Sequence, residues 1–154
     1  MAKWLSWHLR GGVTSDGNII INGTTLADMY KPHVILSAET LNTHYVFKPQ
    51  FPHTYLTFGY GYAWTTSSYK GYSVVGHGGK IHSYASYLHL LRDLDLGIFI
   101  SNNGPGNQNA WFTLYEIFFY IVDLLLQEMP WVNTANACQY PAPWLKTNRS
   151  DTSK

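Results

Sequence analysis

The fold of this chain is decided by one stretch, which reads Gly59-Tyr60-Gly61-Tyr62-Ala63-Trp64, then Gly71-Tyr72, then Gly76-His77-Gly78-Gly79-Lys80. It lies within residues 55–103, which are rich in tyrosine and β-branched residues and are divided by clusters of turn residues. Such runs are typical of paired strands. Glycine inside a strand usually marks a bulge or the close approach of a ligand or another backbone. The sequence therefore predicts an antiparallel meander with a site beside His77.

Working outward, we expect an α+β fold. Its antiparallel sheet has about three strands, at residues 55–66, 72–91 and 96–102, with a turn at 67–71. A long helix at 110–127 packs on this sheet, and short helices precede it. Residues 2–10 have helical spacing of apolar side chains, stopped by Gly11-Gly12. A second helix is expected at 26–30, capped by Thr24 or Thr25 and ended by Pro32. Residues 19–21 resemble a short strand, and residues 33–54 are expected to be a loop that lines one wall of a cleft.

The apolar segment 110–127 raises the question of a membrane span. A narrow polar stripe runs along it, formed by Thr113, Glu116, Tyr120, Asp123 and Gln127. Two carboxylates argue against a spanning helix, so we expect a terminal helix with Asn107 or Asn109 as cap, Pro130 beyond its end, and no membrane partner. Residues 1–130 then form the domain, and 131–154 a loose tail.

The composition bounds the class of protein. The chain has 154 residues, of which 12% are charged and 16% aromatic, and its formal net charge is +1. This excludes a disordered chain, and the scattered basic residues predict no nucleic-acid partner. It suggests a β-rich globule, or a piece of a larger protein whose other part covers apolar surface. The single cysteine, Cys138, excludes an internal disulfide framework and is expected to be inert.

No cofactor is expected, because the seven histidines form no recognisable set of metal ligands with a carboxylate. Met1 leads directly into a helical pattern without the features of a signal peptide. The sequence therefore does not assign a cellular compartment, and a secreted parent protein is one interpretation.

Taken in order, these motifs resemble the C-terminal part of the serine β-lactamase-related family, which groups class C β-lactamases, penicillin-binding proteins, and esterases and animal homologues of the same fold. The family pattern is GYGW, a short loop, HGG or KTG on a strand, and LGxxxxSN, which Leu96-Gly97-Ile98-Phe99-Ile100-Ser101-Asn102 matches. The similarity covers roughly residues 1 to 128. It implies a partial β-lactamase/transpeptidase-like fold, acyl transfer on ester, peptide or β-lactam carbonyls, and a small-molecule or peptide substrate for a complete parent.

The resemblance also implies roles for individual residues. His77 stands at the third-motif position, and the backbone N–H of Lys80 would be one half of an oxyanion hole. Gly78 and Gly79 would let substrate approach the strand edge, with Tyr60 beside it as a further substrate-binding residue. Acyl transfer also needs a nucleophile and a base.

The nucleophile motif of the family, Ser-x-x-Lys, lies in its N-terminal half, and this chain is expected to begin after it. Ser67-Ser68-Tyr69-Lys70 matches the spacing but falls in the predicted turn, whereas the family motif starts a helix. Ser101-Asn102-Asn103 is expected to end a strand. Ser86 and His89, three residues apart in a strand, point to opposite faces.

We therefore expect the chain to be inactive alone. The alternative is a non-catalytic structural or binding module derived from the same fold. In the resembled fold, strands of the N-terminal half pair with the last strand, so the edge at 96–101 would be open here and would favour self-association. A purified chain that is monomeric and melts cooperatively would count against that expectation.

Overall fold

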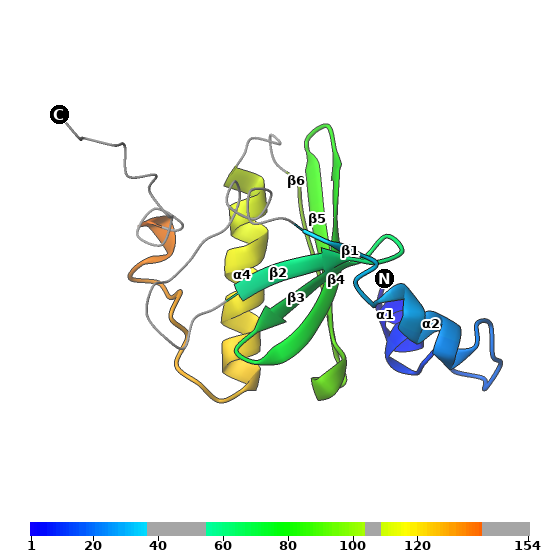
Figure 1. Ribbon diagram of the computed structural model, residues 1–154. Coiled ribbons are helices and arrows are strands. Elements are labelled where there is room, and N and C mark those ends of the chain that lie inside the picture. Colours follow the sequence, from blue (N-terminus) through cyan, green and yellow to red (C-terminus); the bar gives the residue numbers. More distant parts are fainter. Residues whose placement is uncertain (37–54, 104–108, 140–154) are drawn as a thin grey trace.

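A computed structural model of the protein describes residues 1–36, 55–103 and 109–139 (Figure 1). Six strands form one antiparallel sheet in which each strand pairs with the next in the chain. They are β1 (Val34–Ile35), β2 (Tyr55–Tyr60), β3 (Thr65–Tyr69), β4 (Tyr72–Ile81), β5 (Tyr84–Leu91) and β6 (Leu96–Asn103). The α-helices of the described part are α1 (Ala2–Leu9), α2 (Gly23–Met29) and α4 (Asn109–Leu125), with 3₁₀ turns η1 (Arg92–Leu94) and η2 (Ala137–Gln139). The predicted α+β class is confirmed.

The sheet has six strands instead of about three, because a turn divides each of two predicted strands into a pair and a further strand, β1, precedes them. The first breaks after Tyr60 in a turn where Gly61 N–H donates to the Trp64 carbonyl at 2.7 Å and Ala63 has a φ of 61°. A side chain at Gly61 could not fit, since its Cβ would lie 2.3 Å from the Met29 carbonyl oxygen. The second breaks at His82, where φ is 48°.

Two further strand predictions change. The predicted turn at 67–71 is smaller, because β3 continues to Tyr69 and pairs it directly with Tyr72. Part of the predicted loop at 33–54 is strand β1, which pairs Val34 with Tyr60; residues 37–54 lie outside the described part. The predicted strand at 19–21 is reduced to an isolated bridge between Ile19 and Val13.

One face of the sheet is covered by α4 (Figure 1). Because side chains alternate along a strand, every second residue of the strands meets this helix. The buried cluster joins strand residues to Phe118, Phe119 and Val122 of α4, and its strand members are Tyr55, Tyr69, Val74, Leu91 and Ile98. Burial of each large apolar side chain contributes about 1.5–3 kcal/mol, so this cluster is the main core.

The opposite face carries α1 and α2 over part of its area (Figure 1). Leu5 of α1 lies close to β6, since a Cβ added at Gly97 would be 3.0 Å from the Cβ of Leu5. The buried cluster here consists of Leu5, Trp7, Leu26, Tyr30, Trp64, Val75, Leu88 and Leu90. The helix predicted at 2–10 is confirmed, and the second helix begins earlier than predicted. Its cap is Asn22, whose side chain accepts from Thr24 N–H at 2.9 Å, in place of Thr24 or Thr25.

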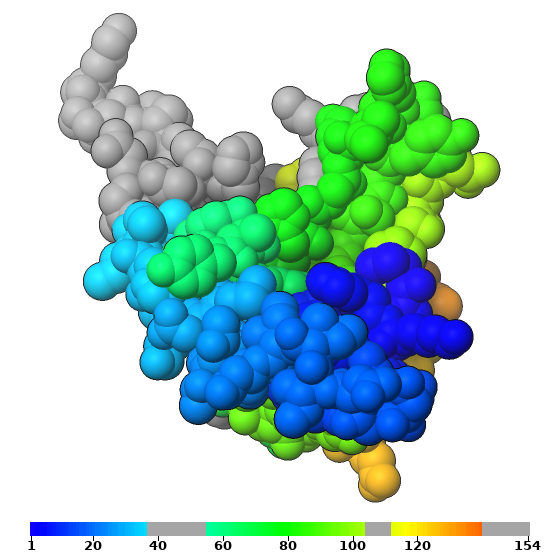
Figure 2. Space-filling model, turned by 90° about the vertical axis from the view of Figure 1, so that its right-hand side faces the viewer, coloured from blue at the N-terminus to red at the C-terminus, as the bar shows by residue number. Residues whose placement is uncertain are grey.

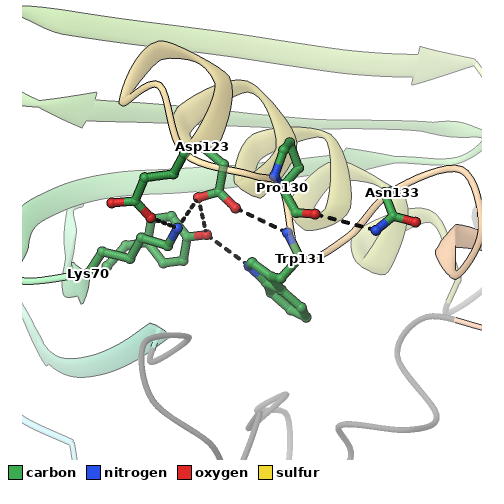
Figure 3. Close-up of polar contacts among 7 residues, drawn as sticks. Lys70, Asp123, Pro130, Trp131 and Asn133 are labelled. Carbon is green, nitrogen blue, oxygen red and sulfur yellow. Dashed lines mark hydrogen bonds and ion pairs between the residues drawn. The ribbon is translucent and has the colours of Figure 1, made fainter.

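The C-terminal end of α4 is held by a buried polar cluster (Figure 3). Asp123 is fully buried, accepts from the Tyr69 hydroxyl at 2.7 Å, and lies 2.8 Å from the Lys70 ammonium. Lys70 also pairs with Glu128, and Trp131 Nε1 donates to the Tyr69 hydroxyl at 2.9 Å. The predicted polar stripe was therefore wrong for Asp123, which points into the protein.

The predicted boundary at residue 130 does not mark the end of packing. Trp131 and Val132 are 7% and 2% exposed and belong to the main core. Residues 133–139 continue as turns ending in η2, and residues 140–154 lie outside the described part. Among the described helices, none is long and apolar enough to cross a membrane.

Candidate functional site

Strand β4 extends beyond its neighbour β3. The pairing of β3 with β4 ends at Thr65 and Gly76, whereas β5 stays paired with β4 as far as Ile81. Residues 77–81 therefore have a strand on one side only, as far as the described residues go. This extended end of β4 carries the glycine-rich motif that the sequence singled out.

The peptide groups of this extended end point alternately toward β5 and away from it. Thr65 Oγ1 donates to the Gly76 carbonyl at 2.6 Å, so the polar groups of Gly76 face β3. Every second residue repeats this direction, which places the N–H and C=O of Gly78 and Lys80 on the side away from β5. Two consecutive outward-facing peptide groups thus form an open strand edge, to which a ligand can hydrogen-bond without disturbing the sheet.

The side chain of His77 lies on the face of the sheet that carries α1. It is exposed, and its Nε2 is 3.2 Å from the Tyr60 hydroxyl. The two rings meet edge to face, with centroids 6.2 Å apart. Tyr60 therefore orients the imidazole, and two of the residues that the sequence proposed for the site are in direct contact.

A groove of about 430 Å³ lies between the extended end of β4 and the helix α1. His77, Gly78 and Gly79 form part of its wall. The other lining residues are mostly apolar or aromatic: Met1, Trp4, Trp7, His8, Ile21, Met29, Tyr62, Ala63, Trp64, Ser86, Leu88 and Phe99. Figure 2 shows this face of the molecule, with α1 and α2 in blue below the projecting β4–β5 hairpin in green.

Lys80 borders a second hollow, of about 410 Å³, at the tip of the β4–β5 hairpin. The strand alternation directs its side chain away from the face that His77 and Gly79 occupy. Only the backbone of Lys80 is thus available to the edge beside the groove. Ser101 and Asn102 line the same second hollow, near the end of β6.

Two groove residues escaped the sequence analysis as site residues. The first is His8 of α1, which is 2% exposed and has its Nδ1 at 2.5 Å from the Tyr30 hydroxyl. Its ring meets the rings of Trp4 and Trp64 edge to face. Burial lowers the pKa of His8 to about 4, so the imidazole is neutral at pH 7. The aromatic spacing of residues 4, 7 and 8 in the predicted helix was the available signal.

The second is Ser86 of β5, which pairs with Gly79. A Cβ at Gly79 would lie 2.9 Å from Ser86 Oγ, so the hydroxyl occupies the space that the missing side chain leaves. Ser86 lines the groove, whereas His89 lies on the other face, stacked on Phe118 at 3.8 Å. The prediction that these two residues face opposite ways is confirmed.

The Ser-x-x-Lys match was predicted to lie in a turn, but it lies largely in β3. Its serine hydroxyl and its lysine ammonium lie in different environments. Ser67 is buried, 2.8 Å from Thr57 Oγ1 and 3.2 Å from the Tyr55 hydroxyl. Lys70 is paired with Asp123 and Glu128 instead. Although burial alone would lower it, these two carboxylates raise the pKa of Lys70, which keeps the ammonium charged. A charged lysine cannot accept a proton from a serine.

No metal centre is evident in the described part of the chain, where no three His, Cys, Asp or Glu side chains are grouped to share an ion. The polar groups that line the groove include the imidazoles of His8 and His77, the hydroxyl of Ser86 and backbone amides, beside a mostly apolar wall.

Comparisons with known proteins bear on the fold. No family model and no curated protein matches the chain. Among solved structures, it is similar to the octameric penicillin-binding protein homologue from Pyrococcus abyssi, with a TM-score of 0.58 and 20% identity. The match covers 84% of this chain and 24% of that one, so the chain spans about a quarter of the solved protein. The chain therefore has a partial fold of the penicillin-binding protein and β-lactamase-like type.

Proposed function

We propose that this chain is the C-terminal part of a β-lactamase-like serine hydrolase, in which the extended end of β4 forms one wall of the substrate cleft. The observation that carries this proposal is the combination of an outward-facing backbone edge at Gly78 and Lys80 with a groove on the same strand. Preorganised backbone N–H groups are among the donors that stabilise the oxyanion of acyl transfer. His77, held by Tyr60, would take part in proton transfer or hold the substrate carbonyl.

In this proposal the attacking hydroxyl belongs to a part of the protein outside these 154 residues. The sequence has a single Ser-x-x-Lys match, and its serine is buried while its lysine is ion-paired. The purified chain is therefore expected to show no turnover of nitrocefin or 4-nitrophenyl butyrate, and no covalent adduct by intact-mass spectrometry. Turnover that is abolished by Ser67→Ala would overturn the proposal.

The positive test uses the longest natural polypeptide that contains this sequence. We expect it to carry Ser-x-x-Lys at the start of a helix upstream, and to hydrolyse one of these substrates. Lys80→Pro, which removes the proposed oxyanion donor, should lower kcat by about 10²–10³-fold, whereas Lys80→Ala, which keeps the N–H, should have little effect. Equal loss in both variants would contradict the backbone role.

A non-catalytic module on the same fold is the second candidate. It is favoured by the hydrogen bond of the buried Ser67 hydroxyl to Thr57 and by the ion pair of Lys70 with Asp123. The upstream reading frame separates the two candidates. If it encodes no serine and lysine one helical turn apart, the parent is a binding or structural protein.

A further inference from the structure

The groove wall contains no formally charged side chain. Among the described residues that line it there is no Asp, Glu, Lys or Arg. The exposed rings of Trp4 and Tyr62 and the partly exposed ring of Phe99 give it an aromatic surface. Moving a carboxylate from water into such surroundings without a paired cation costs several kcal/mol. A charged ligand is therefore disfavoured by the groove itself.

Two cationic side chains on or directly after the strands β4 and β5, Lys80 and Arg92, are directed elsewhere. Lys80 has its side chain on the other face, at the second hollow. Arg92 lies over the ring of Tyr30 at 4.9 Å, at the far end of β5 from Gly79. His8 is in the groove but is neutral at pH 7, because burial lowers its pKa to about 4. None of these three groups neutralises a carboxylate in the groove, where the other ionisable nitrogen groups of the lining are the imidazole of His77 and the terminal α-amino group of Met1.

The polar groups that do reach the groove suit a neutral carbonyl. The open edge of β4 offers backbone N–H donors, and Ser86 Oγ lies over Gly79 beside them. These groups can hydrogen-bond to one ester or amide carbonyl, while the substituents of that carbonyl pack against Trp4, Trp64 and Phe99.

Building on the proposed function, we infer that this groove takes an uncharged acyl compound, an ester or amide with an aliphatic or aromatic side group, in preference to a carboxylate-bearing substrate such as a penicillin. The inference concerns binding, so it can be tested on the 154-residue chain without turnover.

The test compares three probes with the same apolar body: methyl 4-phenylbutyrate, 4-phenylbutyrate and 4-phenylbutylammonium. Binding at pH 7.5 is measured by tryptophan fluorescence, since Trp4, Trp7 and Trp64 line the groove, and by calorimetry. The ester should bind about tenfold or more tightly than either ion. Equal or tighter binding of the carboxylate or of the ammonium ion would overturn the inference. The series is repeated on a chain extended at its N-terminus, in which the charged α-amino group no longer lies at Met1 beside the groove.

A charge placed in the wall should reverse the preference. Phe99 is 38% exposed, so Phe99→Lys is compatible with the fold, and it should raise the affinity for 4-phenylbutyrate relative to the ester by tenfold or more. Trp4→Lys, at 48% exposure on α1, is a second variant with the same expectation. Tyr120→Lys on the outer face of α4 is the matched control and should leave the ratio unchanged. An unchanged ratio in both groove variants would show that the probes bind elsewhere, and would also overturn the inference.

The two proposals fail separately. Absence of Ser-x-x-Lys in the parent would remove the hydrolase but leave the measured preference for the neutral probe intact. Conversely, a catalytic parent whose groove prefers the carboxylate would contradict only the inference about substrate class.

Discussion

His89 is enclosed completely between the sheet and α4. Its ring stacks on Tyr87 at 4.2 Å and on Phe118 at 3.8 Å, and neither ring nitrogen has a hydrogen-bond partner within the described residues. Burial lowers the pKa of His89 to about 3. His8, on the other face of the sheet, has its pKa lowered to about 4 by the same cause. The free energy of unfolding therefore depends on two imidazoles that must stay neutral.

The first prediction is acid sensitivity. A histidine whose folded pKa lies below its unfolded value of 6.5 binds its proton more readily in the unfolded chain, so its contribution is complete above pH 6.5 and is lost as pH falls. Each histidine should contribute a slope of up to about 1.4 kcal/mol per pH unit, down to pH 4 for His8 and pH 3 for His89. His89→Phe keeps the stack and should halve this slope in urea titrations between pH 6 and 4.5. An unchanged slope would show that His89 is not buried as described.

At the scale of single elements, β4 is paired on both sides along one part of its length and on one side only along the rest. Up to Gly76 it is a central strand, and from His77 to Ile81 only β5 accompanies it. The direction of its peptide groups then decides which residues tolerate loss of the N–H. His77 and Gly79 face β5, whereas Gly78 and Lys80 face outward.

Proline substitution tests this assignment, because proline removes a single N–H. Relative to alanine at the same position, His77→Pro should lower the free energy of unfolding by about 2 kcal/mol through loss of a ladder hydrogen bond. Lys80→Pro, compared with Lys80→Ala, should cost less than about 1 kcal/mol. The measurement is chemical denaturation of the four variants, and the opposite order would reverse the assigned direction of the strand edge.

The C-terminal end of α4 depends on Asp123 in a similar way. Its carboxylate accepts from the Tyr69 hydroxyl and faces the Lys70 ammonium, and Trp131 N–H lies 3.4 Å from its other oxygen (Figure 3). The cluster therefore ties the β3–β4 turn to the segment that follows α4.

Removing this carboxylate leaves a buried ammonium with one partner. Asp123→Ala should destabilise the fold by about 3 kcal/mol and loosen the segment at Trp131, seen as a change in its near-ultraviolet signal. Glu128→Gln is the control, since Glu128 is 48% exposed and should cost less than about 1 kcal/mol. Similar losses in both variants would mean that the pair on the surface, and not Asp123, holds the turn.

The sequence predicted the elements better than their limits. Alternation and turn residues located the sheet, and apolar spacing located α1 and α4. It did not show that Ala63 and His82 adopt positive φ, since this conformation is uncommon for residues other than glycine and the two positions carry no glycine signal. Asp123 was misplaced for a related reason: a helical period gives the face of a residue, but a buried partner such as Lys70 can draw a carboxylate inward.

The candidate site was predicted only on the strands β2 and β4. Motif order identified the residues from His77 to Gly79, which do line a groove, and Tyr60, which contacts His77. The opposite wall, with His8 and the tryptophans of α1, required knowledge of how α1 crosses the sheet. Local periodicity carries no such information, because that crossing depends on the close approach of Leu5 to Gly97.

At the scale of the whole molecule, the described sheet ends in β6 on one side, with α1 and α4 packed against its two faces. The match to 24% of a penicillin-binding protein homologue shows a similar fold within a longer chain. We propose that, in a longer protein that contains this chain, the edge of β6 pairs with a further strand. In the isolated chain, the same edge would mediate self-association.

The strictly sequential order of the strands has a consequence for how the chain reaches its native state. After β2, each strand pairs with the one made just before it and each of these steps closes only a short loop, so the entropic cost of bringing distant segments together is largely avoided. Such a sheet can assemble as it leaves the ribosome, one hairpin after another.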